Sequence, residues 1–305
     1  MQYRKLGNTG VDVSLLSYGT GGPSKFGQNT GLDDAGRAAL ISRALELGVN
    51  LFDTAEAYGE AEAMLGRAIK GHARDSYLIA TKWSYKVGDS LVTDPDEITR
   101  QLEQSLERLE TDYVDIFQIH GVMPEDIDYI AENYIPAMQR LKDQGKTRFI
   151  GITEMIIQDP KHTGMSISME RHPDVWDSVM LKYGIMNQWA AKDSLPLAAS
   201  TATGILNMAP VRLTLTRPEK LDERMTEWGE SEGGNTLDWL SGGDPSALIL
   251  KGYQFAAEPE AVTTVISGTS SIAHLEQNVA ALDGTLSDEE SEKLVAAYGD
   301  SASID

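Results

Sequence analysis

The sequence contains no cysteine among its 305 residues. Without thiols the chain cannot form disulfides, use a cysteine nucleophile or build a thiolate metal site. Histidine is also sparse, and the five histidines lack the spacing of paired metal ligands. They are His72, His120, His162, His172 and His274. We therefore expect no bound metal, and the absence of cysteine is compatible with the cytoplasm.

Positive charge is scarce. The chain has 26 Lys and Arg against 47 Asp and Glu, which gives a formal net charge of −21. Nucleic-acid binding needs a basic surface to contact phosphates, so we expect no nucleic-acid partner. The excess of acidic residues favours solubility.

Long apolar runs are missing as well. No stretch approaches the roughly 18 apolar residues that a membrane-spanning helix needs. The opening residues MQYRKLGNTG contain no apolar core of a signal peptide. We therefore expect no membrane association and a cytoplasmic location.

The sequence does contain a regular alternation of short β-branched or aromatic runs with amphipathic helical runs. The predicted strands are 14–18, 50–52, 77–81, 114–119, 148–152, 177–182, 203–208 and 262–266. The predicted helices are 34–48, 60–70, 95–109, 126–144, 165–172, 192–201, 243–256 and 271–281. Strict alternation without a break in composition favours an α/β fold of the (β/α)8 TIM-barrel type, formed as a single domain over residues 1–305.

An open dinucleotide-binding sheet is a poorer match. Such a sheet usually carries G-x-G-x-x-G after its first strand, whereas this chain has Gly19-Thr20-Gly21-Gly22. A nucleotide, if bound, is therefore not held in that manner.

Three segments lie outside the repeating pattern. Residues 3–20 alternate around an Asn-Thr-Gly turn, and we expect a hairpin that closes the bottom of the barrel. Residues 153–172 and 213–241 are too long for plain connections and follow predicted strands. They would lie on the catalytic face, where long loops usually cover a substrate or cofactor. A surface insertion is the alternative.

Four polar residues follow consecutive predicted strands. Asp53 and Tyr58 follow the second strand, Lys82 ends the third and His120 ends the fourth. The carboxyl ends of barrel strands converge on one mouth, so these side chains should meet. A buried Asp–Lys pair is often structural, and a single histidine or tyrosine usually packs. The four residues together favour a catalytic site.

These residue types suit hydride transfer to a carbonyl, which needs a proton donor at the developing alkoxide. Tyrosine has an ordinary pKa of about 10. The ammonium of Lys82 should lower the pKa of Tyr58, and Asp53 should hold Lys82 in place. His120 would hydrogen-bond the substrate oxygen and stabilise its charge. Tyr58 is therefore predicted to be the general acid/base.

The sequence resembles the aldo-keto reductase family over residues 1 to 298. LFDTAEAYGEAEAMLG is similar to the family signature, and LIATKW and DYVDIFQIH are similar to its lysine and histidine segments. RKLGNTGVDVSLLSYGT resembles the family's hairpin, and GKTRFIGIT its fifth strand. The resemblance implies an NAD(P)-dependent oxidoreductase. By hydride transfer it would interconvert an aldehyde or ketone, or a sugar lactol or hydroxyl, and the corresponding alcohol. The resemblance also implies that Asp53, Tyr58, Lys82 and His120 form the catalytic tetrad.

The resemblance implies a set of cofactor contacts along the strand ends. They are Gly19, Thr20, Gly21, Asp53, Thr153, Glu154, Tyr183, Ala209, Val211, Arg212, Gly268, Thr269, Ser270, His274, Gln277 and Asn278. The chain departs from the family at Thr153-Glu154, where Ser-Asn is common, and at Met180, where Gln is common. Tyr183 fits the aromatic that stacks on the nicotinamide. The N-terminus of the helix predicted over 271–281 offers an anion site.

The choice between NAD and NADP depends on the cations near the adenosine. In NADP-dependent relatives a Lys or Arg commonly meets the 2′-phosphate. The corresponding positions here hold Gly268 and His274, which favours NAD slightly. The hydroxyls and the helix end could still hold a phosphate, so NADP stays open.

The substrate pocket is expected to include Trp83, Tyr85 and Trp189 at the mouth. Aromatic walls suit a sugar, a polyol or a small aldehyde equally well. Two other functions stay open on the same barrel. One is a cofactor-retaining epimerase or lyase acting on a sugar, and the other is a weakly catalytic nucleotide-binding regulatory subunit. The sequence leaves the oligomeric state undetermined.

Overall fold

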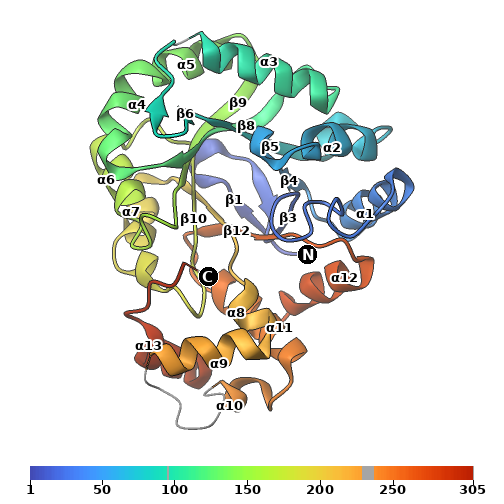
Figure 1. Ribbon diagram of the computed structural model, residues 1–305, viewed down its shortest axis with the longest axis vertical. Helices are drawn as coiled ribbons and strands as arrows, with labels where there is room; N and C mark the ends of the chain where they lie inside the picture. Colours follow the sequence, from blue (N-terminus) through green and yellow to red (C-terminus); the bar gives the residue numbers. More distant parts are fainter. Residues whose placement is uncertain (95, 229–236, 305) are drawn as a thin grey trace.

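The strands form a closed parallel barrel in the computed structural model, which describes residues 1–94, 96–228 and 237–304 (Figure 1). The strand order is β10-β11-β12-β3-β4-β5-β8-β9. The strands are β3 (Leu16–Gly19), β4 (Leu51–Asp53), β5 (Leu78–Ser84), β8 (Val114–Val122), β9 (Thr147–Glu154), β10 (Ser178–Leu181), β11 (Gly204–Asn207) and β12 (Val262–Ser267). The predicted (β/α)8 barrel and its eight strands are confirmed.

Helices surround the barrel (Figure 1). Those that alternate with the strands are α1 (Asp34–Glu46), α2 (Ala61–Ile69), α3 (Glu97–Leu109), α4 (Ile127–Asn133), α5 (Ile135–Asp143), α6 (Thr163–Arg171), α7 (Ser194–Thr201), α11 (Pro245–Ala257) and α12 (Ile272–Ala281). α13 (Asp288–Tyr298) follows them, and Ser287 and Glu290 form a capping box at its start. No helix within the described ranges is long and apolar enough to cross a membrane.

One predicted helix was wrong in its extent. Residues 126–144 form two helices, α4 and α5, which meet at Tyr134. Pro136 lies in the first turn of α5, where its missing N–H and its ring are tolerated, but it cannot continue α4. The helix predicted over 95–109 is α3, which begins at Glu97; Pro95 lies outside the described residues.

The N-terminal hairpin closes one end of the barrel. β1 (Tyr3–Lys5) pairs antiparallel with β2 (Asp12–Ser14). Leu6 and Val13 are fully buried in one apolar cluster with residues near the strand starts, among them Leu51 and Leu78. Because those residues open β4 and β5, the hairpin fills the barrel at the amino ends of the strands, which confirms the prediction.

The two long segments contain more regular structure than plain loops. Residues 153–172 include the end of β9 and all of α6. Residues 213–241 contain α8 (Leu213–Thr216), α9 (Pro218–Glu227) and α10 (Asp238–Ser241), while 229–236 lie outside the described residues. Both segments follow strand ends, so both lie toward the catalytic face.

Candidate active site

The lysine and aspartate predicted for catalysis form a buried ion pair. Lys82 Nζ lies 2.7 Å from each carboxylate oxygen of Asp53 and donates to the Thr54 carbonyl at 2.6 Å. Only 1% of Lys82 and 4% of Asp53 are exposed. Three acceptor contacts fix the ammonium at one point of the mouth.

The Tyr58 ring lies against this ammonium. Tyr58 belongs to a short 3-10 helix, η2 (Glu56–Tyr58), directly after β4. Lys82 Nζ lies 4.9 Å from the ring centroid, and the His120 ring lies 5.7 Å away in an edge-to-face arrangement. Gly21 backs the ring, because a Cβ there would come within 2.8 Å of Tyr58 Cε2. The structure thus brings Asp53, Tyr58, Lys82 and His120 together.

Burial controls the protonation of the two rings. Burial, with a contribution from the Lys82 charge, lowers the pKa of His120 to about 3, so this imidazole is neutral. Burial also raises the pKa of Tyr58 above its usual value. Lys82 opposes that rise without cancelling it, which corrects the expectation of a lowered pKa for Tyr58. At neutral pH the site holds a phenol and a neutral imidazole.

A cavity of about 640 Å³ opens beside Tyr58. It is lined by most of the residues predicted to contact the cofactor. They are Gly19, Gly21, Asp53, Ala209, Val211, Arg212, Gly268, Thr269, Ser270, His274, Gln277 and Asn278. The volume suits a ligand of cofactor size.

Several apolar lining residues were missed. Met208 follows β11, Tyr253 and Ile249 come from α11, and Leu213 and Thr216 come from α8. Met208 is the last residue of the strand predicted over 203–208, a position that could have pointed to it. Leu213 and Thr216 lie in the segment 213–241 that was expected to cover a substrate or cofactor. Ile249 and Tyr253 on α11 carried no such signal, because this helix reaches the mouth only through tertiary packing.

The wall of this cavity at α12 fits a dinucleotide. Ser271 caps α12 by accepting from His274 N, and the remaining amides of the first turn can hold a phosphate. Gly268 packs so closely that a Cβ would lie 3.1 Å from the Gly19 carbonyl oxygen. Thr269 and Ser270 add hydroxyl donors at this wall.

Four of the predicted cofactor contacts do not line the cavity. Thr20 donates its hydroxyl to Thr54 Oγ1 at 2.9 Å, and Thr153 Oγ1 accepts from Gly121 N at 2.8 Å. The Glu154 carboxylate contacts His162 and the backbone N–H of Lys182. In this structure these polar groups bond to neighbouring strands and loops, and their roles as cofactor contacts stay predictions.

Tyr183 is the fourth predicted cofactor contact that does not line the cavity. It stacks on Phe255 with the centroids 5.5 Å apart and the planes 18° apart. Only 5% of Tyr183 is exposed. The ring therefore packs against α11, and Met180 of β10 and Met208 after β11 reach the cavity on this side.

None of the three aromatic residues predicted for the substrate mouth is among the described residues that line the large cavity. Trp83 is 2% exposed and packs edge-to-face on Tyr134 at 5.1 Å. Neighbouring strand side chains alternate, so Trp83 points to the helices while Lys82 points inward. Tyr85 is buried and donates to Asp126 at 2.6 Å. Trp189 lies between the ammonium groups of Lys161 and Lys192, 4.1 and 3.9 Å from its centroid.

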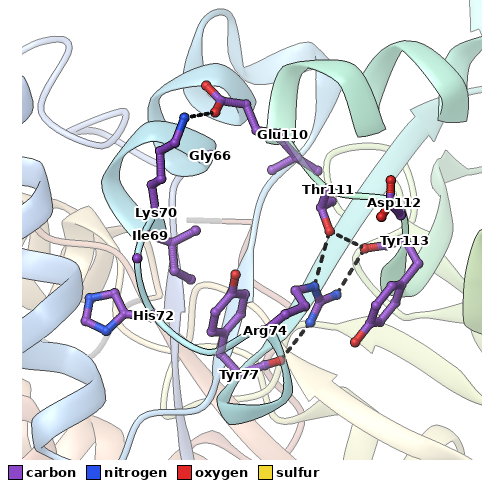
Figure 2. Close-up of a pocket in the computed structure, with 12 residues that line it drawn as sticks. Gly66, Ile69, Lys70, His72, Arg74, Tyr77, Glu110, Thr111, Asp112 and Tyr113 are labelled. Atoms are coloured by element: carbon purple, nitrogen blue, oxygen red, sulfur yellow. Dashed lines mark hydrogen bonds and ion pairs between the residues drawn. The ribbon is translucent and has the colours of Figure 1, made fainter.

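A second cavity, of about 300 Å³, lies where α2 and α3 end (Figure 2). Its residues precede β5 and β8, so it is at the amino ends of the strands, away from Tyr58. Arg74 donates to Thr111, Tyr77 and Tyr113, and Lys70 pairs with Glu110 at 2.6 Å. Its main polar groups bond one another and clip the two loops together.

Comparisons with known proteins agree with this architecture. The family model described as "Aldo/keto reductase family" matches residues 16–298. The chain is similar to L-galactose dehydrogenase of Arabidopsis thaliana, at 32% identity over 92% of this chain and 88% of that protein. It is 27% identical to L-glyceraldehyde 3-phosphate reductase of Escherichia coli (strain K12), over 93% and 88%. The holo form of an aldo-keto reductase from Bacillus halodurans superimposes with a TM-score of 0.74 and 25% identity, over 100% and 97%.

Proposed function

Since this chain belongs to the aldo/keto reductase family, we propose that Tyr58 is its acid/base, that a small sugar or hydroxyaldehyde is its substrate and that NAD is its preferred cofactor. The chain is an oxidoreductase that interconverts a carbonyl and an alcohol with NAD(P). The observation that carries the assignment is the position of the Tyr58 ring between Lys82 and His120 beside the large cavity.

Tyr58, His120 and Lys82 have distinct roles in the reaction. The substrate oxygen lies between the Tyr58 hydroxyl and the neutral His120 ring, each able to donate a hydrogen bond. The nicotinamide supplies the hydride when bound. Tyr58 then gives its proton to the alkoxide oxygen, and the Lys82 ammonium stabilises the phenolate that remains. Because burial keeps Tyr58 protonated at neutral pH, the site already holds the proton that carbonyl reduction consumes.

A hydroxylated substrate is supported by Ser24. This residue lines the cavity, and its buried hydroxyl has no hydrogen-bond partner within the described part of the chain. A buried hydroxyl without a partner is costly, and a hydroxyl of a ligand would satisfy it. The two named relatives act, by their names, on galactose and on glyceraldehyde 3-phosphate.

The preference for NAD rests on the charges around α12. Arg212 is the one Lys or Arg among the described residues that line the cavity, and it belongs to the loop after β11 rather than to α12. Gly268 and His274 occupy the positions where a cation would meet a 2′-phosphate. A 2′-phosphate there would gain little charge compensation.

The deciding experiment compares the unaltered protein with Tyr58→Phe. We expect NADH to bind more tightly than NADPH in calorimetric titrations. Tyr58→Phe should lower kcat for aldehyde reduction by about 10³-fold, because the proton donor is lost, while cofactor Kd stays unchanged. Net consumption of NADH distinguishes this enzyme from a cofactor-retaining epimerase. A variant that keeps most of its activity would remove Tyr58 from its role.

A further inference from the structure

A second buried ion pair lies on the catalytic face, outside the group around Tyr58. Glu154 ends β9, and His162 precedes α6. His162 Nδ1 lies 2.5 Å from Glu154 Oε2, and both side chains are completely buried. A buried ion pair is often no more stabilising than an apolar pair of the same volume, so its presence calls for another role.

Two hydrogen-bonding partners surround the His162 ring. Asn187 Nδ2 donates to the carbonyls of Pro160 and Ser303, each at 3.1 Å. Its Oδ1 must therefore be the atom that faces His162 Nε2 at 3.1 Å. The His162 ring thus meets the Asn187 Oδ1 acceptor at Nε2 and the Glu154 carboxyl group at Nδ1, and an imidazolium can donate to both when Glu154 is a carboxylate.

Burial alone would lower the pKa of His162, but the Glu154 carboxylate and the two hydrogen bonds outweigh it and raise the pKa. Glu154 meets two donors, since its Oε1 accepts from Lys182 N at 2.7 Å. Burial raises the pKa of Glu154, whereas His162 and the Lys182 N–H lower it. Together with the raised pKa of His162, these donors favour a carboxylate beside an imidazolium, and the pair joins the end of β9 to the end of β10.

Asn187 extends this chain of contacts to the loop over 184–188. Gly184 and Asn187 exchange backbone hydrogen bonds at 2.9 and 3.0 Å. The same loop holds the C-terminal segment, because Ser303 N donates to the Met186 carbonyl at 3.1 Å. We call Glu154, His162 and Asn187 the latch.

The latch backs one wall of the cofactor cavity. A Cβ on Gly184 would lie 2.6 Å from the Pro210 carbonyl oxygen, so loop and wall are in direct contact. Arg212 Nη1 reaches the Ile304 carbonyl at 3.5 Å. The wall itself is strained, because Ala209 has φ +49°, a region that non-glycine residues rarely adopt. Strained backbone persists only where its surroundings hold it.

We propose that the latch positions the Ala209–Arg212 wall for dinucleotide binding, which makes His162 a positioning residue; this rests on the proposed function of the cavity. The imidazolium holds the ends of two strands and the loop that supports the wall in a single arrangement. Its effect falls on cofactor affinity and not on proton transfer, because Tyr58 and Lys82 come from the opposite wall.

The test compares His162→Asn and Asn187→Leu with the matched control His172→Asn. Asn tolerates the positive φ of 61° at His162 but removes the charge. His172 flanks the other end of α6 and contacts Asp128 instead of the latch. We expect both latch variants to raise NADH Kd about tenfold through misplacement of the wall, with kcat at saturating NADH nearly unchanged. The control should match the unaltered protein.

Hydrogen exchange of residues 208–213 in the ligand-free protein provides a second measure, and it should become faster in both latch variants. If the unaltered protein binds neither dinucleotide, the proposed function fails while faster exchange still supports the latch. Unchanged exchange and unchanged Kd in folded variants would overturn the latch. A loss of kcat at constant Kd would also overturn the latch.

A third variant covers the case in which both buried substitutions prevent folding. Ser303→Pro removes the N–H that bonds to Met186 near the end of the chain, where the fold is least at risk. Faster exchange at 208–213 supports the latch, and exchange equal to that of the unaltered protein contradicts it.

Discussion

The two walls of the barrel mouth use their polar residues in opposite ways. On the wall formed by β4, β5 and β8, Asp53 and Lys82 meet beneath Tyr58, and His120 faces the same ring. On the wall formed by β9, β10 and β11, strand-end polar groups bond to backbone. Glu154 accepts from Lys182 N, and Asn207 bonds both the N–H and the carbonyl of Tyr183.

The difference shows what decides the role of a strand-end residue. On the second wall, the last paired residues of the strands are Met180 with Thr153 and Leu181 with Asn207. Beyond these pairs, side-chain hydrogen bonds take the place of the backbone ladder. Buried backbone groups at these ends need partners, and nearby side chains supply them. On the second wall the strand-end polar groups therefore serve the backbone, whereas on the first wall Lys82 bonds both the Asp53 carboxylate and the Thr54 carbonyl and still contacts the Tyr58 ring.

Gly21→Ala, on the wall that holds Tyr58, should have the largest effect on activity. The new Cβ would lie 2.8 Å from Tyr58 Cε2 and push the ring away from Lys82 and His120. We expect kcat to fall by about 100-fold, because a misplaced donor transfers its proton poorly. Steady-state kinetics at saturating NADH measure the loss.

The control for this substitution is Gly164→Ala on α6. A Cβ there would lie 3.3 Å from Pro124 N, a contact that a small local shift relieves, so kcat should stay near that of the unaltered protein. Equal activity of Gly21→Ala and the unaltered protein would mean that Tyr58 does not need its observed position.

A smaller effect is expected on the cofactor wall from His274→Arg. His274 lines the cavity at the start of α12. A guanidinium there can pair with a 2′-phosphate, so the affinity ratio of NADPH to NADH should rise about tenfold. Calorimetric titration with both dinucleotides checks the ratio. An unchanged ratio would place the adenosine elsewhere. Gly268→Lys is a poorer test, because a side chain at Gly268 meets the Gly19 carbonyl oxygen.

The fold and the first wall could be predicted from sequence because both depend on local patterns. Strand and helix periodicity gave the barrel, and residues directly after strands gave Asp53, Lys82 and His120. Trp83 could not be placed without the inward direction of Lys82, which fixes its neighbour outward. Glu154 and Tyr183 could not be placed either. Their partners, His162 and Phe255, are distant contacts that no local pattern reveals.

The smallest effect concerns the protonation states of two buried histidines, one on each wall. These two states should contrast sharply. The pKa of His120 is lowered to about 3, and the pKa of His162 is raised. At pH 7, nitrogen-15 spectra of the histidine rings should therefore show a neutral His120 and an imidazolium at His162. His162→Asn and the silent control His172→Asn assign the His162 signals.

The two histidines should also act on stability at opposite ends of the pH range. An unfolded histidine has a pKa of about 6.5. Stability from His162 is fully present below that value and is lost as pH rises through its raised folded pKa. His120 stays neutral when the unfolded chain binds a proton, so stability falls as pH drops from about 6.5 toward 3. Thermal unfolding of the unaltered protein and His162→Asn between pH 4 and 9 measures both slopes. If the difference between the two proteins does not shrink at high pH, His162 is not an imidazolium in the folded protein.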